Sequence, residues 1–436
     1  MAIIKKATDF YDIQDSVAFN TPIDEKHNFY IDFSGFRSDF KEKSIYKHLN
    51  ININTKKCKP LTNEYKKIFL SGYKGTGKTS ELLKLTNNIN DTSCYFTIFV
   101  NIAEEELDTN NIDTVDVLIL MIEKLINKLN EIEIEIDKSI VESFYEWYKT
   151  RIVEVNKNEK STGSVEFEAN AKISLLGLFG IVSKTKAHLH SSTGTKEVIR
   201  QTFNNNFSDF SLKFNEFLLS IKDKFNKEDK YRDILFILDG FEKIGTYDSQ
   251  KKILLDDANK FKNIKSHIII TLPIALSFEK SYLNDFSSIL HFPLIDLDID
   301  GAKDKFRDFI TTRVDEKLFD NSDVIDKIIL YGAGHHRQTL QIINRAYIEA
   351  EEDIIDLESV ENAINILSNE MCQFDKEEIL VLKDIQDNKT PPKSKEYIGL
   401  KAKNIIFDYG MSKDEKINPI VKLNSKLKKQ IEDIDA

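Results

Sequence analysis

One stretch near residue 70 constrains the fold of this chain more than any other part of the sequence. An apolar strand leads into three glycines and a Lys-Thr pair, in the order Ile68-Phe69-Leu70-Ser71-Gly72-Tyr73-Lys74-Gly75-Thr76-Gly77-Lys78-Thr79-Ser80. The spacing is GxxxxGK[ST], the pattern of a phosphate-binding loop between a strand and a helix. Glycine permits positive φ and keeps side chains out of the way, so successive backbone N–H groups can wrap a phosphate.

This loop predicts a nucleotide site in which each part of the motif has a task. The helix start contributes unpaired N–H groups and the positive end of its dipole. Lys78 is expected to reach the β- and γ-phosphates, and the Thr79 hydroxyl is expected to bind Mg²⁺. ATP and Mg²⁺ are therefore the predicted cofactors. The residues predicted to bind them in this loop are Gly72, Tyr73, Lys74, Gly75, Thr76, Gly77, Lys78, Thr79 and Ser80.

A second stretch supplies an acid to the same site. Asp233-Ile-Leu-Phe-Ile-Leu-Asp239 contains five consecutive apolar residues, which is typical of a strand buried on both faces. An acid at the carboxyl end of such a strand lies where α/β sheets bind their ligands. Asp239 is therefore predicted to hold Mg²⁺ together with Thr79. Glu242 is the nearest acid to orient an attacking water, a role that depends on the turn after Asp239.

Three more apolar segments complete a predicted sheet. They begin near residues 94, 267 and 288, and with the strands near 66 and 233 they alternate with helices. This alternation predicts an α/β fold of the P-loop NTPase type, with five parallel strands and right-handed crossovers. Residues 61–298 are therefore predicted to form the ATPase core.

Three other regions are predicted around this core. Residues 1–60, here the N-terminal segment, contain a short strand at 30–33 and a helix within 38–48, and are expected to brace the core or contact a partner. Residues 299–371 form a helical lid. Residues 372–436, here the C-terminal unit, form a winged-helix-like domain.

Residues 157–195 are predicted to be a β-hairpin inserted into the core. Residues 165–173 and 185–190 alternate apolar and polar side chains, as strands with one wet face do. The apolar segment 175–182 lies between them, so an exposed tip that contacts another chain is expected. Burial of the same segment inside the protein is the alternative, and the sequence does not choose between the two.

Composition limits the partners and the compartment. The net charge is −11, so nucleic acid gains no general electrostatic attraction to this chain. The longest apolar run, 173–182, is far shorter than the ~20 residues that cross a bilayer, and the start lacks a signal-peptide pattern. This short run predicts no membrane association. Cys58, Cys94 and Cys372 are scattered and odd in number, which predicts ordinary thiols in a reducing cytoplasm.

Through these motifs, the chain resembles the STAND branch of the AAA-like P-loop ATPases. GYKGTGKTS at 72–80 and ILFILDGFEKI at 234–244 carry the resemblance. Asp239 takes the place of the metal-binding acid of the Walker B motif, and Gly240 follows it where most AAA+ enzymes carry a catalytic Glu. The next acid, Glu242, comes two positions after Gly240, as in the DGLDE-type motif of NACHT and related proteins. The segment 417–421 resembles the terminal strand of a winged helix, so the resemblance covers about residues 65–436.

The lid resembles two groups at once. STAND lids often carry Gly-x-Pro, and His336 takes the place of that proline. Arg337 resembles an AAA+ sensor-2 arginine, and Thr271 matches the sensor-1 position that contacts the cofactor. Arg307 and Arg313, on the first lid helix, are expected on a solvated face, and action of either one as a finger on a neighbouring subunit's nucleotide is the alternative. The resemblance implies catalytic roles for Lys78, Asp239, Glu242 and Arg337.

The resemblance implies an ATP-dependent molecular switch with slow basal hydrolysis. Such a switch holds its lid and C-terminal unit in one arrangement with ATP and in another with ADP. The chain shows no obvious effector module and no repeat array. A separate effector or sensor protein is therefore the expected partner, in bacterial signalling or anti-phage defence, and homo-oligomers are expected as well.

A nucleic-acid-loading ATPase of the origin-recognition type is the alternative function. That family also combines a GTGKT loop, an AAA-like lid and a winged helix. Its Walker B strand, however, ends in an Asp-Glu pair, and in this chain Gly240 stands in the place of that Glu. The C-terminal unit contains 13 Lys, 12 Asp plus Glu and no Arg, which is not the basic footprint of a DNA reader. Binding to nucleic acid stays an open question at the level of sequence.

Overall fold

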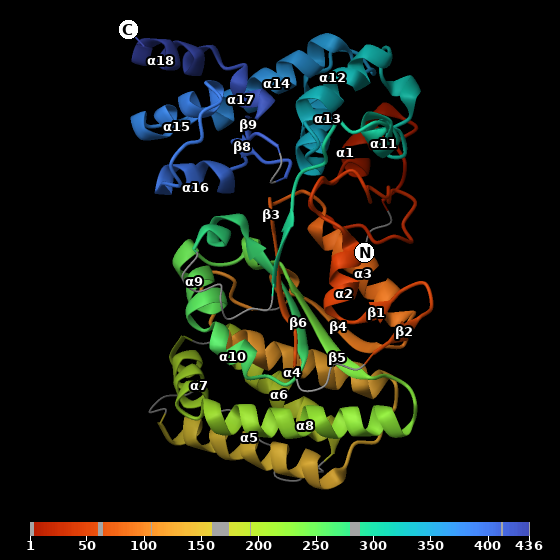
Figure 1. The fold of residues 1–436 in the computed structure, drawn as a ribbon, viewed down its shortest axis with the longest axis vertical. Coiled ribbons are helices and arrows are strands. Elements are labelled where there is room, and N and C mark those ends of the chain that lie inside the picture. The colour runs from red at the N-terminus through yellow and green to blue at the C-terminus, as the bar shows by residue number, and fades with distance from the viewer. Residues whose placement is uncertain are drawn as a thin grey trace.

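A five-stranded parallel sheet forms the centre of the computed structural model (Figure 1). The model describes residues 4–59, 64–105, 107–158, 174–191, 193–279, 288–410 and 413–435. The strand order β4-β5-β6-β3-β7 and the parallel pairing confirm the predicted P-loop NTPase sheet. The strands are β3 (Lys67–Gly72), β4 (Tyr95–Asn101), β5 (Asp233–Asp239), β6 (His267–Pro273) and β7 (Ser288–Phe292).

One layer of helices covers one face of this sheet, and two layers cover the other face. On one face, α2 and α3 pack on Leu70, Leu235 and Ile269. On the other face, α4 covers the strands, and α5, α6, α7 and α8 form a further helical layer beneath it (Figure 1). Asp113 caps α4: its side chain accepts from the Val115 N–H, and its own backbone N–H donates to the Asp116 carboxylate. The core helices are α2 (Glu42–His48), α3 (Lys78–Asn90), α4 (Thr114–Glu131), α9 (Tyr247–Lys251) and α10 (Ala258–Lys262).

The helical layer between β4 and β5 replaces the predicted β-hairpin. Residues 175–191 form a helix, so the hairpin prediction is wrong there, and residues 165–173 lie outside the described ranges. Leu178 and Val182 are fully buried, whereas Leu176 is 69% exposed, so the alternative of a buried segment holds for most of it. Asn206 separates α7 from α8. The layer consists of α5 (Lys138–Asn158), α6 (Leu175–Ser191), α7 (Thr193–Asn205) and α8 (Phe207–Lys227).

The physical reason for the wrong hairpin is that Thr185 and Leu189 also fit helical spacing. These two residues, four positions apart, are buried with Ile181 and Val182, whereas Ala187 between them is exposed. Tertiary packing decided the outcome, because α6 lies against α4 and α5.

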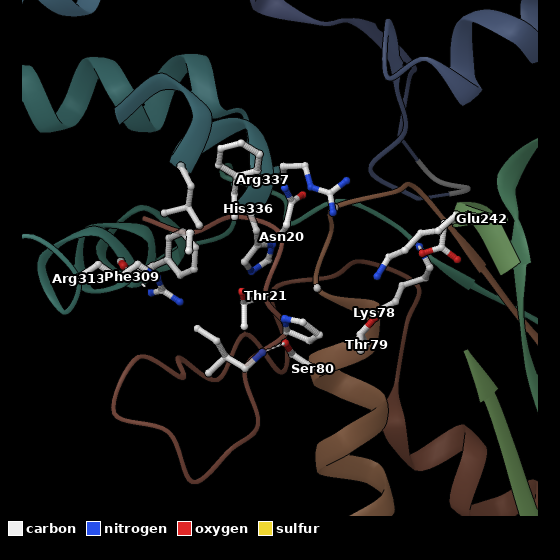
Figure 2. A pocket seen from close by; sticks show the side chains of 18 residues that line it. Asn20, Thr21, Lys78, Thr79, Ser80, Glu242, Phe309, Arg313, His336 and Arg337 are labelled. Carbon is white, nitrogen blue, oxygen red and sulfur yellow. Dashed lines mark hydrogen bonds and ion pairs between the residues drawn. The ribbon is translucent and has the colours of Figure 1, made fainter. Parts of the chain in front are cut away.

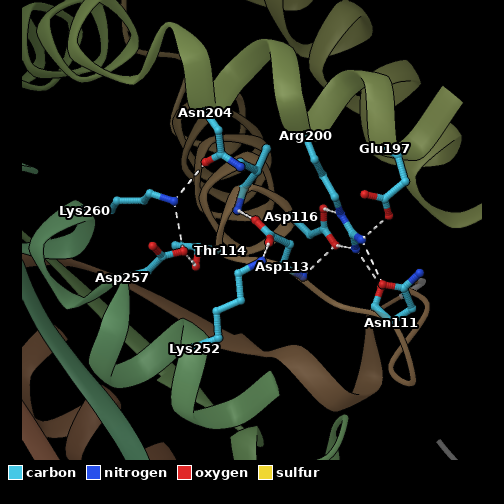
Figure 3. A network of polar contacts seen from close by, with 11 residues as sticks. Asn111, Asp113, Thr114, Asp116, Glu197, Arg200, Asn204, Lys252, Asp257 and Lys260 are labelled. Atoms are coloured by element: carbon cyan, nitrogen blue, oxygen red, sulfur yellow. Dashed lines mark hydrogen bonds and ion pairs between the residues drawn. The ribbon is translucent and has the colours of Figure 1, made fainter. Parts of the chain in front are cut away.

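A buried ion pair ties this helical layer to the core (Figure 3). Arg200 on α7 donates from Nε to Asp116 at 3.1 Å, with a second, shorter bond from its other nitrogen, and it also binds Asn111. Lys252 donates to the neighbouring Asp113 at 2.6 Å. Arg200 and Asp116 are 5% and 2% exposed, so removing either partner would strand a buried charge.

The lid has its own apolar core, and the start of the chain belongs to it. Ala7, Phe10, Ile13 and Val17 pack among lid helices, and Phe33 packs on Phe306. Residues 30–33 form no strand, so that prediction is wrong. The lid helices are α11 (Ala302–Thr311), α12 (Ser322–Gly332), α13 (His336–Glu349) and α14 (Leu357–Met371), joined by the N-terminal α1 (Ile13–Ser16).

The later part of the N-terminal segment braces the sheet as predicted. Phe40, Ile45 and Leu49 pack on the face that α3 covers. A small antiparallel ribbon, β1 (Ile51–Asn52) and β2 (Lys57–Cys58), follows. Cys58 forms a disulfide with Cys94, whose Cα lies 5.8 Å away, so the prediction of separate thiols is wrong for this pair. The two cysteines are 36 residues apart, and only the docking of the ribbon beside β4 brings them together.

The C-terminal unit is mostly helical, with one two-stranded ribbon. It consists of α15 (Lys376–Gln386), α16 (Lys395–Ala402), β8 (Ile406–Phe407), β9 (Lys416–Ile417), α17 (Pro419–Lys422) and α18 (Ser425–Asp435). Ile417 lies in a strand, as the winged-helix resemblance implied, but residues 419–422 turn into a helix that Asn418 caps. None of the helices in the described ranges combines the length and the apolar character that a membrane crossing needs.

Candidate nucleotide-binding site

The phosphate loop joins β3 to α3 at the carboxyl edge of the sheet. Gly75 and Gly77 have φ of +88° and +89°, a left-handed conformation that glycine adopts without penalty. A Cβ on Gly75 would stand 2.7 Å from the Cβ of Arg337, so the loop also needs this glycine for close approach of the lid. α3 begins at Lys78 and aims its free N–H groups at the loop, which makes an anion site.

Lys78 lies buried inside the loop that it serves. Its Nζ donates to the carbonyl of Tyr73 at 2.7 Å and to that of Gly72 at 3.2 Å. Burial lowers the pKa of Lys78, while the charges of Glu242 and Asp239 act in the opposite direction. Lys78 therefore stands at the loop, next to two acids, as a phosphate-binding lysine requires.

The predicted metal ligands Thr79 and Asp239 are in direct contact. The Thr79 hydroxyl donates to Asp239 Oδ2 at 2.6 Å, although 160 residues separate them. Asp239 Oδ1 is buried and has no hydrogen-bond partner among the described residues. Burial raises the pKa of Asp239, and the charge of Glu242 raises it further. A hydroxyl beside an unsatisfied carboxylate oxygen fits Mg²⁺, which would neutralise phosphate charge when bound.

Glu242 reaches the site because Gly240 makes a sharp turn after β5. Gly240 has φ of +93°, and residues 241–243 form one turn of 3₁₀ helix. Glu242 Oε1 then lies 4.0 Å from Lys78 Nζ, and Oε2 is buried with no partner among the described residues. The turn therefore brings Glu242 beside the phosphate loop (Figure 2). The sequence alone did not decide whether Glu242 reaches the site.

The lid touches the loop through three consecutive residues at the start of α13. His335 Nε2 lies 2.9 Å from the Lys74 carbonyl oxygen, and the Arg337 backbone N–H donates to the Gly75 carbonyl at 3.1 Å. Arg337 and His336 line the cavity in front of Lys78. Burial lowers the pKa of Arg337, and Glu242 opposes this shift. The sensor-like arginine is therefore at the site, as the resemblance implied.

The N-terminal segment forms one wall of the site, which the sequence did not predict. Residues 18–23 line the cavity, and the Ile23 N–H donates to Ser80 Oγ at 3.2 Å (Figure 2). Arg37, 8% exposed, donates to the Thr76 carbonyl at 2.7 Å and so holds the loop from behind. No motif signals these residues, because they reach the loop only through the fold.

Arg307 on α11 and Arg313, two residues after the end of that helix, have different surroundings. Arg307 pairs with Asp326 near the surface, as a solvated face predicts. Arg313 is 4% exposed, lies over the Phe309 ring and lines the same cavity as Lys78, so the solvated-face prediction is wrong for it. Burial lowers the pKa of Arg313 to about 9.

Four predicted cofactor residues do not line the cavity with their side chains, and the exposed Lys74 is one of them. Tyr73 is fully buried against the C-terminal unit, and the Thr76 hydroxyl donates to the Tyr73 carbonyl at 2.9 Å. Thr271 is buried on β6, and its hydroxyl has no partner among the described residues. Tyr73 and Thr76 can therefore serve a phosphate only through their backbone, and Thr271 lies on β6 next to the end of β5.

Comparisons with known proteins add little to this geometry. No family model matches the chain, and no curated protein sequence matches it. Among solved structures, the chain is similar to the crystal structure of Cdc6p from Pyrobaculum aerophilum, with 13% sequence identity and a TM-score of 0.36. The match covers 95% of this chain and 100% of the other. A similarity this remote carries no argument about activity or partners.

Proposed function

We propose that this chain is an ATP-dependent molecular switch that hydrolyses ATP slowly. The observation that supports it most is the direct docking of the C-terminal unit on the phosphate loop. Tyr73 packs with Phe407 and Tyr409, and Asn404 approaches the Lys74 carbonyl at 3.4 Å. The lid touches the same carbonyl through His335. A phosphate bound to this loop would therefore change the contacts that the lid and the C-terminal unit make with the loop.

The size of the cavity supports a movement of these parts. The cavity among the loop, the lid and residues 18–23 has a volume of about 120 Å³. Pockets for ligands of nucleotide size have roughly 300–1,000 Å³. We infer that the lid and the N-terminal segment move apart from the loop when a nucleotide binds, so the occupant of the site sets their arrangement.

Slow hydrolysis follows from the polar groups around the loop. Gly240 has no side chain to act on water, and Glu242, the nearest acid, lies close to Lys78. A carboxylate that faces the lysine is not positioned to orient an attacking water, so turnover is expected to need a rearrangement of this pair. A separate effector or sensor protein, or self-assembly, would supply it, as in signalling or anti-phage defence.

Small-angle scattering tests the switch. The radius of gyration of the protein is measured without nucleotide, with Mg·ADP and with a non-hydrolysable ATP analogue and Mg²⁺. We expect two distinguishable nucleotide-bound values, and no difference in Lys78→Ala. Identical scattering in all three states, with nucleotide shown to be bound, would reduce the site to a static nucleotide binder.

Nucleic-acid loading of the origin-recognition type is the second candidate function. The comparison with Cdc6p agrees with this alternative better than with a STAND assignment, although its TM-score of 0.36 is too low to carry the choice. Gel shifts with duplex DNA at ~50 and ~200 mM salt test it, because binding through phosphates weakens steeply over this range. Nucleotide-dependent binding at both salt concentrations would favour the loader over the signalling switch.

A further inference from the structure

Three polar side chains form a row across the carboxyl edge of the sheet. Asn101 ends β4 and is the register partner of Asp239, which ends β5. Thr271 follows next on β6, because Leu238 is paired with Ile270 one position earlier. Residues two positions apart in a strand share a face. Asp239 therefore lies on the face of Ile237, which α3 covers.

Asn101 is the member of this row that no motif predicts. It is 6% exposed, and both Oδ1 and Nδ2 are buried without a hydrogen-bond partner among the described residues. A buried amide with neither end satisfied destabilises a folded protein, and such groups in native structures call for an explanation. Packing alone does not give one, because an apolar side chain of similar volume would fill this position at lower cost.

The turn after β5 is shaped around this amide. A Cβ added to Gly240 would stand 2.6 Å from Asn101 Oδ1 and 3.2 Å from the Cβ of Ala103. Gly240 also has φ of +93°, which side-chain-bearing residues rarely adopt. The carboxamide of Asn101 therefore occupies the space in which a side chain at position 240 would begin. The edge of the sheet presents a neutral amide there, on the strand next to Asp239, whose Oδ1 also has no partner among the described residues.

We propose that Asn101 is an outer ligand of the divalent cation held at Thr79 and Asp239, and binds a water molecule carried by that cation. Neighbouring strands lie about 4.8 Å apart, and Asn101 and Asp239 make no direct bond among the described contacts, so the free polar atoms of both side chains are left for a group that enters with the cation. Water on a cation is a strong donor, and Oδ1 of a carboxamide accepts from it. This assignment rests on the proposed nucleotide function.

The experiment measures how nucleotide binding depends on Mg²⁺, and does not rely on hydrolysis. Fluorescent ATP is titrated with protein in EDTA and then at increasing Mg²⁺, for the wild type, Asn101→Leu and Asn101→Asp. Thr97→Val is the matched control, because Thr97 is a buried polar residue on the same strand, four positions from the edge. Thermal midpoints are recorded without nucleotide or metal.

Asn101→Leu is expected to bind nucleotide in EDTA like the wild type, but to need roughly 10-fold more Mg²⁺ for half-maximal enhancement, the usual effect of losing an outer ligand. Its thermal midpoint should equal or exceed that of the wild type, because two unsatisfied atoms are removed. Asn101→Asp keeps an acceptor oxygen and should need less Mg²⁺ than Asn101→Leu, and Thr97→Val should match the wild type.

The opposite pattern overturns the assignment. If Asn101→Leu lowers the thermal midpoint and leaves the Mg²⁺ dependence unchanged, Asn101 serves packing alone. If Asn101→Leu does not fold, Asn101→Asp decides, and an unchanged Mg²⁺ dependence there has the same meaning. If the wild type binds no nucleotide even with Mg²⁺, the proposed function itself fails, which is a different result from a loss confined to the variants.

Discussion

Replacing Tyr73 by alanine should loosen the C-terminal unit from the phosphate loop. The Tyr73 side chain is 0% exposed and packs with Leu294, Phe407 and Tyr409. Truncating a buried aromatic ring to alanine costs about 3–5 kcal/mol. If this cost falls on the docked state alone, the equilibrium between docked and open forms changes on the order of a hundred- to a few-thousand-fold.

Hydrogen exchange of the backbone amides in α15 and α16 measures this opening. We expect exchange there to accelerate by the same factor in Tyr73→Ala, while exchange in β5 stays close to that of the wild type. Tyr73→Phe is the matched control. The Tyr73 hydroxyl is buried without a partner among the described residues, so its removal should be neutral or slightly stabilising.

Two results would refute this reasoning. Unchanged exchange in the C-terminal unit of Tyr73→Ala would mean that Tyr73 supports the loop and not the docking. A Tyr73→Phe variant as loose as Tyr73→Ala would mean that the hydroxyl has a partner, and that the packing estimate is the wrong basis for the effect.

Further predictions concern the phosphate site and its pH dependence. Lys78→Ala should weaken ATP binding at least tenfold in a filter or fluorescence assay, whereas Lys74→Ala, an exposed side chain in the same loop, should not. Glu242→Gln should lower steady-state hydrolysis with little change in ATP affinity; an unaffected rate would remove Glu242 from the mechanism. Asp239→Ala should abolish the Mg²⁺ dependence of ATP binding. Burial lowers the pKa of His335 to about 3, below the unfolded value of ~6.5, so the folded state binds fewer protons. Stability from this residue is complete above pH ~6.5 and declines below it, and the thermal midpoint of His335→Asn should fall less steeply between pH 7 and 5 than that of the wild type.

The centre of the fold and of the site follows from sequence alone. A phosphate loop needs local order, namely a strand, glycines and a helix start, and Gly75 and Lys78 sit where that order places them. The five consecutive apolar residues before Asp239 predicted a strand, because such a run is typical of a strand buried on both faces. The Thr79–Asp239 contact was predictable because parallel strands end at one edge.

Some of the missed residues had a signal that went unused. Asn101 follows an apolar strand as Asp239 does, so the same rule of a polar residue at the strand end would have found it. Arg37 and Arg313 offered no such signal. They are buried beside the loop and the cavity because distant segments fold over them, and a sequence shows neither contact.

Tertiary packing decided everything that depends on which surfaces meet. Residues 185–190 alternate like a strand, yet they form a helix because α4 and α5 offer an apolar surface at helical spacing. Cys58 and Cys94 join because a ribbon docks beside β4. Local residue patterns were enough to predict the phosphate loop, its acid and the parallel sheet. The docking of the lid and of the C-terminal unit on Tyr73 and Lys74 arose only in the tertiary structure, because it depends on shape complementarity between segments more than 250 residues apart.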